Sequence, residues 1–203
     1  MRYSMGDVGM LQAMYDDPAW VHDFCDVFTA FTIRHLEFLF REVGIPDSYT
    51  VYDDLAYTTT SFCSPAMYRE FITPYHTRLV RFLKDHGISV ILHSCGNISR
   101  QLANIVDAGI DCVQPMEAKT HMDLFQLASD FQGRLCFMGN IDIRALETNR
   151  PSVIEAEILP KLERVRRNRI PYIFHTDHSI SPLVRIESYE HALELFRENC
   201  HYA

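Results

Sequence analysis

The sequence predicts an α/β fold, specifically an incomplete (β/α) barrel of about five β/α units. Strand-like runs alternate with helical segments, and each run is nearly all apolar, as in a parallel sheet buried on both faces. Barrel enzymes assemble their active sites at the carboxyl ends of several strands, which favours a barrel over an open sheet here. The polar or ligand-type residues that follow the predicted strands are Asp53 and Asp54; His93, Cys95 and Asn97; Gln114 and Glu117; Asn140 and Asp142; His175, Asp177 and His178.

The length of the chain limits how much of a barrel it can form. A complete barrel needs eight strands and about 250 residues, whereas these 203 residues supply about five strands. We therefore expect residues 1–203 to form a single barrel domain that lacks its N-terminal strands. Such a piece would have two open sheet edges and exposed apolar surface, so we expect a homo-oligomer or a partner that completes the barrel.

Composition excludes several classes of partner. Hydrophobic residues make up 47% of the chain and charged residues 23%, as in an ordinary globular protein. The formal charge of −8 offers no footprint for nucleic acid or for an anionic membrane surface. The first seven residues have no apolar core of a secretory signal, and no later run approaches the roughly 18 apolar residues of a membrane span. We therefore expect a cytoplasmic protein that acts on small molecules, with its six cysteines as free thiols.

Local signals assign the elements in order. Asp17 and Pro18 start a long amphipathic helix, because acidic residues favour a helix N-terminus and proline fits its first turn. Residues 48–55 are rich in Tyr and Val, which favour a strand, and Ser64-Pro65 is typical of a helix N-cap. Glycines end the later helices. The predicted elements are a helix end or loop at 10–15, helix 19–43, strand 48–55, helix 65–86, strand 88–93, helix 100–108, strand 110–114, helix 122–131, strand 135–138, helix 152–168, strand 171–174 and helix 187–199.

The strand 88–93 ends in two residue types that bind soft metals. Because side chains alternate along a strand, His93 and Cys95 fall on the same side of the chain, one pleat apart. Imidazole nitrogen and thiolate sulfur are both normal zinc ligands. The alternative is a hydrogen-bonded histidine beside a small buried cysteine. Glu117 and His178, at neighbouring strand ends, are candidates to complete a zinc site.

Four segments resemble the C-terminal part of the uroporphyrinogen decarboxylase superfamily: Ser64–Phe71, His93–Asn97, Gly139–Asp142 and Tyr172–Ile180. The resemblance covers nearly the whole chain and implies a (β/α)8 barrel whose first strands are absent here. It also implies an enzyme, since the superfamily contains porphyrin-pathway decarboxylases, corrinoid-dependent methyltransferases and, more distantly, cobalamin-independent methionine synthase.

The branches differ in the residues they share with this chain. The decarboxylases use no metal and lack the His-x-Cys found at 93 and 95, whereas the methyltransferases carry it as zinc ligands. Methionine synthase adds a glutamate at about the spacing of Glu117, so the resemblance implies His93, Cys95 and Glu117 as ligands. Where the methyltransferases place a cysteine, this chain has His178, and the decarboxylases use a histidine there to bind substrate. His178 is thus either a fourth ligand or a substrate contact.

These observations leave three functions to compare. The first is a zinc-dependent methyltransferase component that moves a methyl group between a corrinoid or methoxylated donor and a thiol-type acceptor, with the corrinoid on a partner protein. The second is a metal-free uroporphyrinogen decarboxylase, and the third is a split barrel that is inactive without a partner. The predicted catalytic residues are His178 and Asp54. The predicted substrate-binding residues are Asp53, Asp54, Asn97, Asn140, Asp142 and His175.

Overall fold

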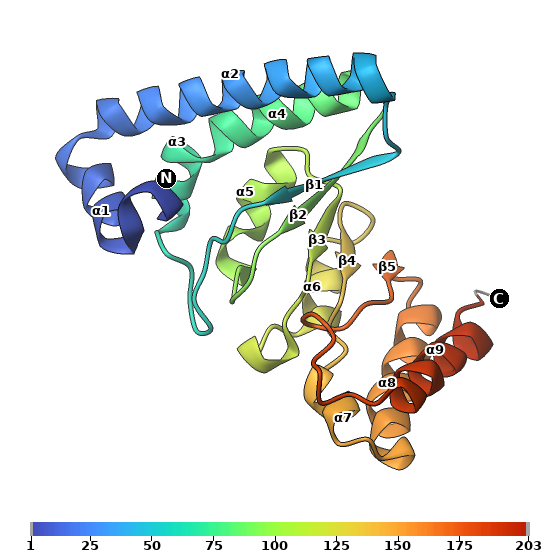
Figure 1. Ribbon diagram of the computed structural model, residues 1–203. Coiled ribbons are helices and arrows are strands. Elements are labelled where there is room, and N and C mark those ends of the chain that lie inside the picture. The colour runs from blue at the N-terminus through green and yellow to red at the C-terminus, as the bar shows by residue number, and fades with distance from the viewer. Residues whose placement is uncertain (1, 202–203) are drawn as a thin grey trace.

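A single sheet of five parallel strands forms the centre of the computed structural model, which describes residues 2–201 (Figure 1). The strands lie in sequence order, so each one pairs with the strand that precedes it in the chain. This order is the one that a (β/α) barrel requires, and the strands form a partial barrel. Their bounds are β1 Ser48–Tyr52, β2 Ser89–His93, β3 Cys112–Gln114, β4 Cys136–Met138 and β5 Tyr172–Ile173.

Helices follow each strand, and two further helices precede β1 (Figure 1). α2 and α4 run side by side at one end of the sheet, and α8 packs against α9 at the other. None of the helices in the described residues is long and apolar enough to cross a membrane. The helices are α1 Arg2–Asp16, α2 Pro18–Val43, α3 Pro65–Phe71, α4 Thr73–Asp85, α5 Leu102–Asp107, α6 Leu124–Asp130, α7 Ile143–Glu147, α8 Pro151–Arg167 and α9 Ile186–Asn199, with short 3-10 turns η1 Ser99–Gln101 and η2 Ala118–Thr120.

The predicted single helix over 65–86 is wrong, because the structure has two helices there. α3 ends at Phe71, because the next residue, Ile72, has a φ of −120° that is not helical, and α4 begins at Thr73. Pro74 explains the break: proline has no N–H to donate, and its ring would clash with the carbonyl of Glu70 in a continuous helix. The predicted N-cap at Ser64 is confirmed, since its side chain accepts a hydrogen bond from the Met67 N–H at 3.2 Å.

The structure differs from the prediction at two further places. β1 ends at Tyr52, so Asp53 and Asp54 lie in the loop after the strand and not within it. The 10–15 segment, predicted as a helix end or loop, is the last part of α1, which agrees with the prediction. The sequence reading also missed α7, which begins directly after Asp142; that side chain caps the helix by accepting the Arg144 N–H at 2.9 Å.

The core lies mainly on one face of the sheet. The strand register places Val90, Leu92, Val113 and Phe137 on that face, and their side chains are fully or almost fully buried. On the opposite face Ile91 and Cys136 are only half-buried. β1 and β5 are the two edges of the sheet in the described part of the chain, and apolar side chains of α2 near β1 are largely exposed. The strand register brings the carboxyl ends of β1, β2 and β3 to the same level, since Tyr52 pairs with His93 and His93 with Gln114. The loops after these strands form the candidate site.

Candidate functional site

His93 is the last residue of β2 and is oriented by its neighbour in β3. Its Nδ1 hydrogen-bonds to Oε1 of Gln114, the residue that pairs with it across the strands. Because the amide oxygen accepts only, Nδ1 carries a proton, which leaves Nε2 as the nitrogen with a lone pair in the neutral ring. Nε2 lies 3.6 Å from Cys95 Sγ and 3.8 Å from Asp54 Oδ1. The neutral ring therefore presents its acceptor nitrogen to a thiol and a carboxylate.

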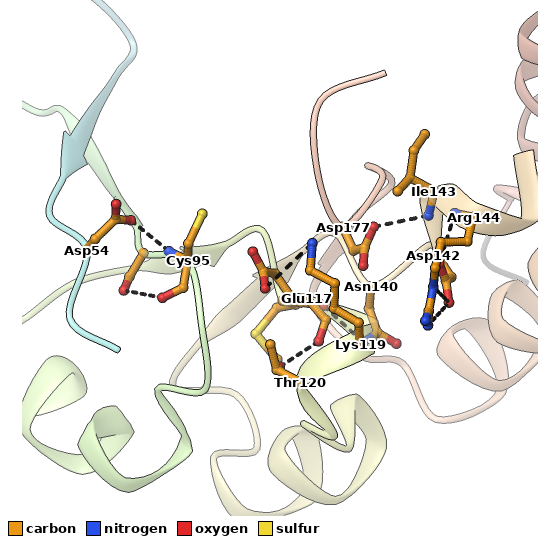
Figure 2. A network of polar contacts seen from close by, with 12 residues as sticks. Asp54, Cys95, Glu117, Lys119, Thr120, Asn140, Asp142, Ile143, Arg144 and Asp177 are labelled. Carbon is orange, nitrogen blue, oxygen red and sulfur yellow. Dashed lines mark hydrogen bonds and ion pairs between the residues drawn. The ribbon is translucent and has the colours of Figure 1, made fainter. Parts of the chain in front are cut away.

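The loop after β1 is bonded to the end of β2 at three successive positions. The Asp53 N–H donates to the His93 carbonyl at 2.9 Å, Asp54 Oδ1 accepts the Cys95 N–H at 2.9 Å, and the Leu55 N–H donates to Ser94 Oγ at 2.9 Å. Figure 2 shows the Asp54 to Cys95 bond. These bonds fix the Asp54 carboxylate beside the thiol.

Gly96 permits this close approach. Its φ is 85°, in the left-handed region, and a Cβ built there would lie 2.5 Å from the carbonyl oxygens of both Ala56 and Tyr57. Only glycine can occupy such a position without moving one of the two loops. The backbone around Gly96 thus allows the β1 and β2 loops to pack together.

Asp54, His93 and Cys95 form the one group in the described residues that could hold a metal ion. One ligand atom from each lies within 4.8 Å of the others. The set contains an imidazole nitrogen, a sulfur and a carboxylate oxygen, which are the donors that zinc prefers. The three residues therefore fit a zinc ion by the chemistry of their donors. Sequence reasoning assigned Asp54 to catalysis and substrate binding, because nothing in the sequence shows which loops meet.

Glu117 lies near this group but outside it. Its side chain is almost fully buried, and one oxygen lies 3.9 Å from Lys119 Nζ (Figure 2). Burial, together with the nearby negative charges of Asp54 and Glu117, raises the pKa of the Cys95 thiol to about 12. A bound cation would favour the thiolate and so oppose this shift. Glu117 is therefore placed to affect the charge of the site, and its predicted role as a ligand stays a prediction.

His178 is exposed and is not part of the three-residue group. Its backbone carbonyl accepts a hydrogen bond from Thr176 Oγ1. The structure thus does not bring this predicted fourth ligand to the other candidates.

The remaining predicted pocket residues are hydrogen-bonded within the fold. Asn97 bonds to the Thr120 carbonyl, Asn140 to the Met116 carbonyl, and His175 to the Thr176 carbonyl. Asp142 pairs with Arg144, whose hydrogen bonds lower the pKa of the Asp142 carboxyl group (Figure 2). Their roles in substrate binding stay predictions.

Two supporting residues were missed by the sequence reading. Gln114, described above, orients His93. Asp177 is fully buried and accepts the Ile143 N–H at 3.0 Å (Figure 2), which ties the loop after β5 to the start of α7. Both belong to the polar residues that follow the predicted strands, but no local pattern indicates that they act through a neighbour.

A groove adjoins the three-residue group, and we call it the α2–β1 groove. Its cavity has a volume of about 570 Å³ and is lined by residues from α1, α2, β1, α3, α4 and the loop after β1. Asp53, Asp54 and His93 lie in its lining. The groove is therefore continuous with the candidate metal site.

A parallel β/α sheet with a histidine, a cysteine and carboxylates at its carboxyl edge has the arrangement in which proteins of the (β/α)-barrel class build their active sites. The chain belongs to the uroporphyrinogen decarboxylase (URO-D) family, whose model matches residues 2–199. A methyltransferase from Methanosarcina mazei has a similar structure, with a TM-score of 0.74 and 15% identity over 95% of this chain and 53% of that protein.

Relatives with established names include more than one activity. Uroporphyrinogen decarboxylase from Geotalea daltonii is 31% identical over 131 residues, which cover 64% of this chain and 37% of that enzyme. Methylated-thiol–coenzyme M methyltransferase from Methanosarcina mazei is 33% identical over 96 residues, covering 47% of this chain and 24% of that enzyme. The matched regions span about a quarter to two fifths of these relatives, which are enzymes of two kinds.

Proposed function

We propose that this chain is a zinc-dependent methyltransferase component that moves a methyl group between a corrinoid or methoxylated donor and a thiol acceptor. The observation that carries the proposal is the convergence of Asp54, His93 and Cys95 within 4.8 Å. A zinc ion held there would lower the pKa of an incoming thiol and present a thiolate at neutral pH. The similarity to a methylated-thiol–coenzyme M methyltransferase supports the same chemistry.

The chain's own residues would prepare this site in three ways. Gln114 keeps the proton on Nδ1 of His93, so that Nε2 is available as a ligand. The Cys95 N–H holds the Asp54 carboxylate in place. The His93 side chain is only 19% exposed and that of Asp54 24%, so these two ligands are partly shielded from water.

The metal content of the purified, tag-free protein tests this proposal. We expect near-stoichiometric zinc by elemental analysis, and its loss in Cys95→Ser. Cys200→Ser is the matched control, because Cys200 is a partly exposed free thiol outside the three-residue group, and it should keep the metal. The rate of methyl transfer from a free methyl-corrinoid to 2-mercaptoethanol should be proportional to the zinc content of the protein. A well-folded protein without zinc would contradict the proposal.

Decarboxylation of uroporphyrinogen is a second candidate, because the matching family model and several curated relatives carry that name. In that case His178 and Asp54 would contact the substrate and assist protonation, and no metal would take part. Turnover of uroporphyrinogen that survives Cys95→Ser would favour this candidate. A need for a partner is compatible with either activity, since the matches span less than two fifths of those relatives.

A further inference from the structure

The permanently charged groups that line the α2–β1 groove are two carboxylates, those of Asp53 and Asp54. No Lys or Arg is among the described residues that form the groove, and its two histidines, His76 and His93, each face one of these carboxylates. A groove of this kind attracts a cation and repels an anion, most strongly where water is excluded. Asp54 is bonded to Cys95 in the candidate metal site, which makes Asp53 the carboxylate that is placed for a ligand.

Asp53 is held from behind by two buried side chains. Its Oδ2 accepts from His76 Nε2 at 3.1 Å, and Nδ1 of the same ring is hydrogen-bonded with the Tyr68 hydroxyl at 3.1 Å. His76 is 8% exposed and Tyr68 is fully buried, whereas 45% of the Asp53 side chain is accessible. The carboxylate is thus fixed in orientation while it faces solvent. An acceptor fixed in this way binds a ligand without first losing side-chain entropy.

Aromatic side chains line the same groove as this carboxylate. They are Phe24, Phe28, Phe62, Phe71 and Tyr75. The faces of aromatic rings attract cations, and aromatic cages are a common way to bind quaternary ammonium ligands. The apolar rings also accommodate an uncharged hydrocarbon body.

We propose that the α2–β1 groove binds the part of the substrate that carries an organic ammonium group on an apolar body, with Asp53 as its counter-ion. The inference deepens the proposed function, because His93 and Asp54 belong both to the groove and to the candidate metal site. Asp53 is then a specificity-determining residue, and His76 and Tyr68 are its positioning residues. The groove would exclude substrates that present a carboxylate or sulfonate at this point.

A matched pair of probes tests this selectivity on the protein as purified. Benzyltrimethylammonium and phenylmethanesulfonate share an aromatic body and differ in the sign of their charge. We expect the cation to bind at least tenfold more tightly in titrations followed by calorimetry or by line broadening of the probe resonances. Equal affinities, or tighter binding of the sulfonate, would overturn the proposal without any variant having to be made.

The Asp53→Asn variant locates the cation. We expect it to weaken benzyltrimethylammonium binding at least fivefold, while binding of the sulfonate becomes no weaker because a repelling charge has been removed. Asp23→Asn is the control, since it removes the same charge from an exposed position of α2 outside the groove lining. Equal losses in the two variants, or none in Asp53→Asn, would show that the cation binds elsewhere. Zinc content is measured separately: absence of zinc refutes the proposed function and leaves the probe result standing.

Discussion

At the scale of single residues, the candidate site depends on side chains that act through a neighbour. Gln114 is the clearest case, because its amide oxygen determines which nitrogen of His93 carries the proton. Partners of this kind typically change metal affinity by about 10- to 100-fold when they are removed.

We expect Gln114→Leu to weaken zinc binding by about that factor, because the His93 ring loses its orienting acceptor. Competition with a chromophoric chelator measures the affinity. Gln114→Glu keeps an acceptor oxygen beside His93 and should retain most of the zinc affinity. Gln126→Leu is the control, because Gln126 is exposed, and it should leave the zinc affinity unchanged. An unchanged affinity in Gln114→Leu would mean that the histidine is positioned by other contacts.

Tyr68 gives a second prediction at this scale. Its hydroxyl group is fully buried and satisfies His76, so Tyr68→Phe leaves a buried ring nitrogen without that partner. The cost of such a loss is about 1–3 kcal/mol in the free energy of unfolding, which urea denaturation measures. Tyr57→Phe, at a side chain that is 47% exposed, should cost little. The same loss in both variants would argue against the buried hydrogen bond as the cause.

At the scale of elements, the sequence predicted five strands and most helices but not how their loops meet. Hydrophobic period and capping residues are local signals, and they identified α2, α8 and α9 to within a few residues. The break between α3 and α4 also has a local signal, because Pro74 lies at the start of α4. The helical spacing of apolar residues continues on both sides of it and therefore predicted a single helix. The contact of Asp54 with Cys95 is not local, because it depends on parallel pairing of β1 with β2.

Gly96 tests how far the site depends on this loop contact. Gly96→Ala places a methyl group 2.5 Å from two carbonyl oxygens in addition to straining a residue with φ of 85°. We expect it to destabilise the fold by more than about 2 kcal/mol and to weaken zinc binding, as Asp54 moves away from Cys95. Gly87→Ala separates the steric clash from the backbone strain. Gly87 also has positive φ, at 76°, but nothing lies within 4 Å of the added carbon.

Thermal unfolding and zinc affinity of the two variants give the comparison. Gly87→Ala should be destabilised only by the strain of a non-glycine residue at positive φ, and it should bind zinc as tightly as the unmodified protein. Equal destabilisation in both proteins would mean that the contact with the 56–57 backbone relaxes without consequence for the site.

At the scale of the whole molecule, the sheet has two edges and an exposed apolar surface beside one of them. β1 and β5 each lack a second neighbour in the described residues, and Val27, Phe31 and Phe38 on α2, which do not line the α2–β1 groove, are 49–60% exposed. The sequence predicted open edges from the strand count alone, but it could not identify which side of the amphipathic α2 would be exposed. That depends on α2 packing against α4, a tertiary contact.

Exposed aromatic surface of this extent promotes association, so we expect the 203-residue chain on its own to self-associate through the α2 side. Sedimentation velocity over a range of protein concentrations should show species larger than the monomer. Phe31→Ser should shift the distribution toward monomer, whereas Leu183→Ser, at an equally exposed position far along the chain, should not. If the unmodified chain is monomeric at all concentrations and unfolds cooperatively, the exposed side of α2 needs no second copy, and the partial barrel is stable as it stands.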